Sequence, residues 1–169
     1  MKSFSLSWLF ILTFVVSKGQ QLSVQPLADW QFKSKGSTTW YKAQVPGTIH
    51  TDLLNNQLIP DPFYGTNEQQ LQWISDSTWE YQTNITITEE QLQQEQIGLV
   101  FEGIDTYAKI LINNHEVLTA DNMFRKWTID LKPILKVGTN TILVILEPNE
   151  VRAKNLAKQL PYTLPGEDR

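Results

Sequence analysis

Carboxylates are the side chains of this sequence that could most readily catalyse a reaction. Glycoside hydrolysis typically uses two of them on either side of the scissile bond, one as acid/base and one as nucleophile in a retaining enzyme. Glu68 follows Asn67 in an aromatic-rich stretch, and Glu102 and Asp105 flank the turn after an expected strand. Because the chain has 18 Asp and Glu residues, such pairs arise easily by accident. We therefore assign no catalytic residue.

Other chemistry is excluded by residues that the sequence lacks. The chain has no Cys, so disulfides, thiolate nucleophiles and Cys-based zinc sites are impossible. Its two His residues, His50 and His115, lie far apart, and no Gly-rich phosphate loop or nucleophile elbow occurs. The net charge of −4 does not fit a protein that must neutralise phosphates of nucleic acid. We expect no metal, no cofactor and no nucleic-acid partner.

Aromatic side chains could form a stacking platform for a sugar, whose axial C–H faces are apolar. The candidates nearest to expected loops are Trp40, Phe63, Tyr64, Trp73 and Trp127. The competing interpretation is core packing, which is favoured for aromatics at strand spacing such as Trp79 and Tyr81. For Tyr64 and Trp73 the two interpretations are evenly balanced.

Arg125 is a candidate for binding a carboxylate. Its planar guanidinium could orient a carboxylate of a neighbouring domain through two parallel hydrogen bonds. The alternative is a surface salt bridge, which is the commoner use of such a residue.

Short strands are expected to position these side chains. The clearest covers 78–88, where aromatic and β-branched residues at every second position alternate with polar ones. Further strands are expected at 30–32, 97–102, 107–112, 115–119, 126–131 and 141–146. The Asn113-Asn114 pair suits a tight hairpin turn, and the apolar run at 141–146 indicates a strand buried on both faces. Many short strands with little helix favour a β-sandwich.

Helices are expected to be few and short. Thr88 and Gln91 match a capping box, which predicts a helical turn at 89–95. Another helix is expected at 48–55, with inward side chains at Ile49, Leu53 and Leu54. Two prolines make 60–65 an ordered loop.

The tail is predicted to be a helix followed by a loop. Asn149 is expected to cap a helix that Pro161 ends. Its apolar stripe consists of Ala153, Leu156, Ala157 and Leu160.

The N-terminus has the features of a secretory signal peptide. Lys2 precedes a mostly apolar run at 6–16, and Ser17 and Gly19 are small residues before a cut at Gln20. A membrane anchor is the alternative, but a span needs about 20 apolar residues, roughly twice this run. The predicted organisation is a signal peptide at 1–19, a β-sandwich at 20–148, and a helix and loop at 149–169. We expect a secreted or periplasmic protein without a transmembrane helix.

Five separated motifs resemble the β-mannosidases of glycoside hydrolase family 2. They are VPGTIHTDLL at 45–54, IPDPFYGTNE at 59–68, QWI and WEY at 72–74 and 79–81, FEGIDTYA at 101–108, and ADNMFR at 120–125. The resemblance covers essentially the whole chain after the signal peptide, in order. Agreement across five motifs is far more specific than agreement in one.

The resemblance implies an all-β, jelly-roll, galactose-binding-domain-like sandwich with short helices and a C-terminal helical tail. In this family immunoglobulin-like domains and a TIM barrel follow, and the barrel supplies both catalytic glutamates. The implied reaction is exo-acting, retaining hydrolysis of terminal non-reducing β-D-mannose. Asn67 resembles by position an Asn that lies close to the sugar in related β-galactosidases. With Tyr64, Trp73 and Arg125 it is expected to line the pocket rim.

The sequence departs from the family at its end. A Trp-Asp-Trp-Gly-Pro-like segment follows in these enzymes, whereas this sequence ends at Arg169. We therefore expect an inactive fragment, whose partners are a β-mannoside glycan and downstream domains of the same protein. Two alternatives stay open: the same domain from a relative that cleaves galactosides or glucuronides, and a free-standing carbohydrate-binding module.

Overall fold

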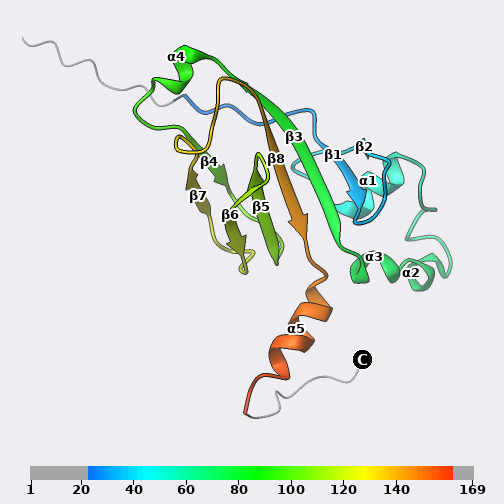
Figure 1. Cartoon of the computed structure of the whole chain (residues 1–169). Helices are drawn as coiled ribbons and strands as arrows, with labels where there is room; N and C mark the ends of the chain where they lie inside the picture. Colours follow the sequence, from blue (N-terminus) through cyan, green and yellow to red (C-terminus); the bar gives the residue numbers. More distant parts are fainter. Residues whose placement is uncertain (1–22, 162–169) are drawn as a thin grey trace, which may run out of the picture.

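A computed structural model describes residues 23–161, which form two antiparallel β-sheets with short helices at their ends (Figure 1). The strands are β1 (Gln31–Ser34), β2 (Tyr41–Lys42), β3 (Trp79–Ile87), β4 (Gly98–Phe101), β5 (Ala108–Ile112), β6 (His115–Ala120), β7 (Trp127–Asp130) and β8 (Gly138–Leu146). The helices are α1 (Ile49–Asn55), α2 (Asn67–Gln70), α3 (Trp73–Asp76), α4 (Glu89–Leu92) and α5 (Asn149–Ala157). The expected strands and helices are all present.

The larger sheet has six strands in the order β2-β1-β3-β8-β5-β6, and the smaller sheet pairs β4 with β7. At its centre β3 and β8 pair in register from Trp79 opposite Leu146 to Ile87 opposite Gly138. This long pairing follows from the alternating sequence of β3, since a period of two places its aromatic and β-branched residues on one face.

The core lies on that face and receives side chains from both sheets. Phe32, Ile110, Ile112 and Ile142 are fully buried, and Leu99, Trp127 and Ile129 of the smaller sheet are nearly so. Each large apolar side chain of this kind contributes about 1.5–3 kcal/mol through burial. The prediction that β8 is buried on both faces was wrong. Its second face, with Leu143 and Ile145, is only half-buried because no described element covers it fully.

Turns and caps follow the local sequence closely. Asn113 and Asn114 join β5 to β6 and have positive φ values of 51° and 68°. The turn was predicted because Asn tolerates the left-handed backbone conformation. The capping box of α4 is also confirmed, because the Thr88 side chain accepts from Gln91 N and the Gln91 side chain accepts from Thr88 N.

Helix α1 faces the core with residues other than those predicted. Leu53 is buried and Ile49 half-buried, but Leu54 is 40% exposed and Asp52 takes its place inside. The reason is the helical turn of 3.6 residues, which puts 49, 52 and 53 on one face and turns 54 away. The prediction that Ile49, Leu53 and Leu54 all point inward was therefore wrong for Leu54.

Helix α5 extends away from the sheets (Figure 1). Its N-cap is Pro148, and Asn149 is its first residue and makes no cap hydrogen bond, so the predicted Asn149 cap was wrong. The predicted apolar stripe is not packed, since the helix has no buried residue. The expected signal peptide at 1–19 and the loop after Pro161 lie outside the described residues, and no helix within 23–161 is long and apolar enough to cross a membrane.

Candidate functional site

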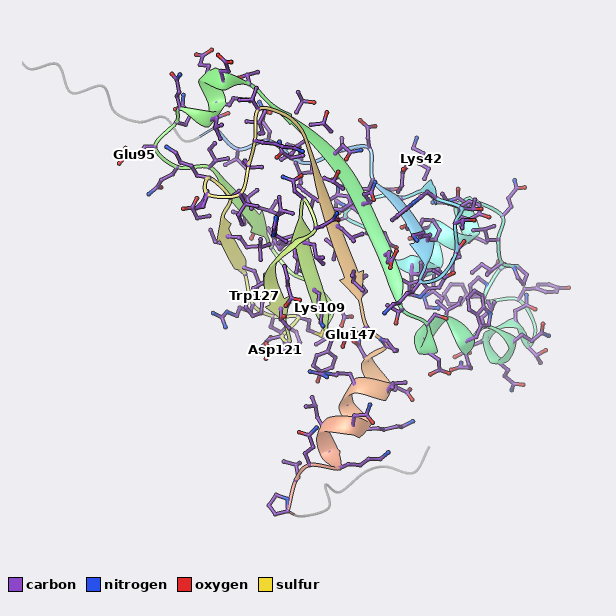
Figure 2. The ribbon with its side chains drawn as sticks, in the orientation of Figure 1. Lys42, Glu95, Lys109, Asp121, Trp127 and Glu147 are labelled. Atoms are coloured by element: carbon purple, nitrogen blue, oxygen red, sulfur yellow. The ribbon has the colours of Figure 1, made fainter. Side chains whose placement is uncertain are left out.

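Three loops that carry the candidate site residues lie at one end of the sandwich. Trp79 and Ala108 both pair with Leu146, and Ala108 also pairs with Ala120, so these four residues mark one end of the larger sheet. The adjoining segments 60–78, 102–107 and 121–126 therefore lie at this end, which we call the loop end. Figure 2 shows Asp121, Trp127, Lys109 and Glu147 gathered there, with Glu95 at the opposite end.

Segments 102–107 and 121–126 contact each other, and helix α5 contacts the first of them. A Cβ at Gly103 would lie 3.2 Å from the backbone oxygen of Met123, so 102–107 and 121–126 approach closely. Lys126 Nζ forms an ion pair with Glu102 Oε1 at 2.8 Å, and Asn149 Nδ2 donates to Asp105 Oδ1 at 3.3 Å. Glu102 and Asp105 thus make contacts between loops, and nothing in their surroundings marks either as an acid or a nucleophile.

The loop at 60–67 presents aromatic rings to solvent. Phe63 is 97% exposed and Tyr64 is 78% exposed. The loop is closed by Asn67, whose Nδ2 donates to the backbone oxygen of Asp61 at 2.8 Å, and by Phe63 N, which donates to Asp61 Oδ1 at 2.9 Å. Within residues 23–161 the side-chain oxygen of Asn67 has no hydrogen-bond donor, so it is available to a ligand hydroxyl.

Trp73 combines a packed and a free face. Its ring lies 6.0 Å from that of Trp79, which is buried and donates from Nε1 to Ile74 O at 3.0 Å. Trp73 itself is 45% exposed, and the free part of the ring can stack on an apolar surface.

Arg125 and Trp127 form a cation–π pair at the loop end. The guanidinium carbon lies 4.3 Å from the ring centroid, within the range of a favourable contact. Arg125 makes no ion pair in the part of the chain that the structure describes, so the salt-bridge interpretation was wrong. Trp127 was also wrong as a stacking platform, because it is a core residue with a buried indole N–H that has no partner.

The candidate site residues lie at the loop end but come from separate segments and do not form one cluster. Tyr64, Asn67 and Trp73 come from the segment before β3, whereas Arg125 comes from the segment before β7, next to 102–107. Trp40 comes from a third segment, the β1–β2 connection, and the Lys33 ammonium lies 5.0 Å from its ring centroid. Among the described residues no three His, Asp or Glu side chains are grouped so that they could hold a metal ion.

Asp52 and Tyr81 form a buried polar pair that sequence reasoning missed. Asp52 is 1% exposed, and its carboxylate accepts from Gln44 N at 2.8 Å and from the Tyr81 hydroxyl at 2.9 Å. Burial, with a smaller effect of the Asp52 charge, raises the pKa of Tyr81 well above its ordinary value. The signal was available, because Asp52 lies three residues after Ile49 on the inner face of the helix. The pair joins α1 to β3 and so supports the loop that follows α1.

A family model described as "Glycosyl hydrolase 2 galactose-binding domain-like" matches residues 30–169. The chain belongs to this family. The β-sandwich fold class and the resemblance to glycoside hydrolase family 2 are thereby confirmed, and β-mannosidase relatives at 36% and 39% identity confirm the likeness to the β-mannosidases of that family.

Similar proteins include β-mannosidases. The chain is 36% identical over 128 residues to β-mannosidase A of Emericella nidulans, which covers 73% of this chain and 14% of that protein. A crystal structure of β-D-mannosidase from Dictyoglomus thermophilum has a TM-score of 0.81 and 39% identity, covering 84% of this chain and 18% of that one. A β-D-glucuronidase of the same organism shares 13% identity with a TM-score of 0.55, which shows the fold alone. The chain thus spans under a fifth of these relatives' length.

Proposed function

We propose that this chain is the N-terminal, non-catalytic domain of an exo-acting β-mannosidase. The observation that carries this proposal is the 39% identity to a β-mannosidase over 84% of the chain, with the same fold. In the parent protein, which hydrolyses terminal non-reducing β-D-mannose, the catalytic glutamates lie in a downstream barrel and act by the retaining mechanism. The domain itself carries out no chemical step.

We propose that the loop end completes the sugar pocket of this parent protein. Tyr64, Asn67, Trp73 and Arg125 lie on the rim, with the free oxygen of Asn67 accepting from a sugar hydroxyl. Arg125 keeps all its donors available, since it is held by ring stacking instead of by a carboxylate. The exposed rings of Phe63 and Tyr64 face the downstream domains, which would remove their apolar surface from water.

Export and domain boundaries belong to the same proposal. Residues 1–19 act as a signal peptide, residues 20–148 form the sandwich, and 149–169 connect it to the following segment. The partners are a β-mannoside glycan and the downstream immunoglobulin-like and barrel domains, and the compartment is the cell exterior or the periplasm.

A chimera tests this function. Residues 30–161 of this chain replace the equivalent residues of the Dictyoglomus thermophilum β-mannosidase, and aryl β-mannoside, β-galactoside and β-glucuronide are offered as substrates. We expect hydrolysis of the mannoside by the chimera and no hydrolysis by the chain alone. Mannoside hydrolysis by the isolated chain, or a chimera that folds by circular dichroism but is inactive, would contradict the proposal.

A further inference from the structure

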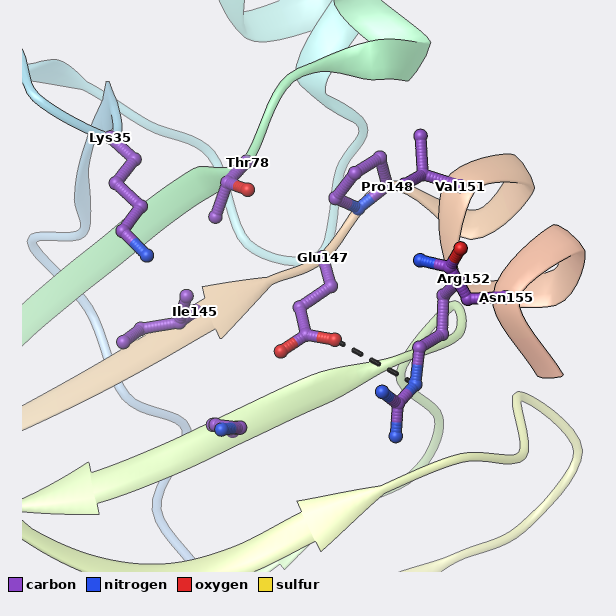
Figure 3. Close-up of a pocket in the computed structure, with 9 residues that line it drawn as sticks. Lys35, Thr78, Ile145, Glu147, Pro148, Val151, Arg152 and Asn155 are labelled. Carbon is purple, nitrogen blue, oxygen red and sulfur yellow. Dashed lines mark ion pairs between the residues drawn. The ribbon is translucent and has the colours of Figure 1, made fainter. Parts of the chain in front are cut away.

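A hollow of about 310 Å³ lies at one corner of the outer face of the larger sheet, away from the core (Figure 3). The strand register explains which residues reach it. Lys33 pairs with Glu80, and Glu80 and Lys109 each pair with Ile145, so these side chains share the outer face. Lys35 lies two residues after Lys33, and its N–H donates to Thr78 O at 2.9 Å. The strand ends thus supply one side of the hollow.

Helix α5 supplies the other side. The chain turns at Pro148 directly after β8, and the first turns of the helix bring Arg152 and Asn155 to the hollow. Glu147 lies between Lys35 and Arg152 in the close-up view (Figure 3). Its carboxylate is 3.9 Å from the Arg152 guanidinium, which is the outer limit of an ion pair.

The charges in this hollow do not balance. Lys35, Lys109 and Arg152 face the single carboxylate of Glu147, so the lining has a net charge of +2 in a protein whose net charge is −4. Neither Lys35 nor Lys109 has an ion-pair partner within residues 23–161. Lys33, on the same face, is by contrast paired with Glu80 at 3.0 Å.

We propose that this hollow binds an oxyanion of charge −2, a phosphate or sulfate group. The lining offers three cations, the Thr78 hydroxyl and the Asn155 amide as hydrogen-bond donors, and charge-assisted bonds to an anion are the strong ones. The Arg152 guanidinium offers a planar fork to two oxygens, whereas the lysines act as point charges. The group is either a free anion or an ester on a sugar. The hollow also lies at the loop end, but none of the proposed rim residues Tyr64, Asn67, Trp73 and Arg125 lines it, so the anion proposal does not depend on the mannose rim.

The test is a calorimetric titration of inorganic phosphate into this chain, with ionic strength held constant by NaCl. We expect saturable binding and a rise in Tm. The variants are Lys109→Gln, Lys35→Gln and, as a matched control, Lys42→Gln, an exposed lysine of β2 that lies outside the hollow. Each of the first two should weaken binding about tenfold, the typical value of one charged hydrogen bond, and Lys42→Gln should leave it within about twofold.

A second titration with mannose 6-phosphate distinguishes the two sources. Equal affinity for the sugar ester and for inorganic phosphate supports a site for a free anion, and tighter binding of the ester supports a site for a charged glycan. Loss of both signals in Lys109→Gln ties either ligand to the hollow. No saturable heat at constant ionic strength, or equal weakening by Lys42→Gln, would overturn the proposal. Each variant's Tm without anion shows that it is folded.

Discussion

Replacing Tyr81 by Phe removes one hydroxyl from the core and leaves an oxygen of Asp52 without its donor. The hydroxyl donates to Asp52 Oδ2 at 2.9 Å, and Asp52 is 1% exposed, so water cannot readily replace the lost bond. A buried hydrogen bond to a charged group is worth about 1.5–3 kcal/mol. At an unfolding entropy of about 2.1 cal/mol/K per residue, a loss of about 2 kcal/mol lowers Tm by about 7 °C in a domain of this size.

Thermal and urea unfolding of this chain, followed by circular dichroism, measure the loss. Tyr41→Phe is the matched control, because it deletes the same atom from a half-buried ring whose hydroxyl makes no hydrogen bond with residues 23–161. The double variant of Tyr81→Phe with Asp52→Asn should lose about 1 kcal/mol less than the two single losses added together. If Tyr81→Phe costs no more than Tyr41→Phe, the Asp52–Tyr81 pair does not stabilise the fold and the reasoning fails.

Three other predictions concern stability. Burial raises the pKa of Tyr81 above its ordinary value of about 10, so the contribution of Tyr81 to the free energy of unfolding is complete below pH 10 and declines above it as the phenol of the unfolded chain ionises. The fall of unfolding free energy between neutral and alkaline pH should therefore be smaller in Tyr81→Phe than in the unmodified chain. Asn140 is fully buried, and its side chain forms hydrogen bonds with Lys136, Gly138 and Asn113. Asn140→Ala should therefore lower the free energy of unfolding in urea by about 2–4 kcal/mol, whereas Asn84→Ala, at an exposed position, should lower it by only about 0.5 kcal/mol. Asn114→Val places a β-branched residue at φ 68° and should lower unfolding free energy by about 1–2 kcal/mol in the same assay, whereas an unchanged value would show that the turn adapts.

Local patterns in the sequence predicted most of the elements. The alternation along β3, the turn at Asn113 and Asn114 and the capping box at Thr88 each depend on neighbours within a few residues, and each is confirmed. Propensity and capping act locally, so one sequence is enough to show them.

The errors concern what packs against what. Leu54 was predicted to point inward and Trp127 to stack on a sugar, both from residue type. The phase of the helix turns Leu54 outward, and Trp127 is buried in the core. The convergence of 60–78, 102–107 and 121–126 could not be derived from spacing, because it depends on the register of β8 with β3 and β5, which lie far from it in the chain. The hollow lined by Lys35, Lys109 and Arg152 was missed for the same reason.

The central claim is that the loop end of this domain forms part of a sugar pocket. Its most direct test is kcat/KM for an aryl β-mannoside in the chimera with Asn67→Ala, compared with Asn84→Ala, an exposed Asn on β3 away from the loop end. We predict that Asn67→Ala lowers kcat/KM about tenfold or more, as the loss of a hydrogen bond to substrate should, without lowering Tm by more than a few degrees, and that Asn84→Ala has no effect. Equal kcat/KM for the two variants would contradict the claim.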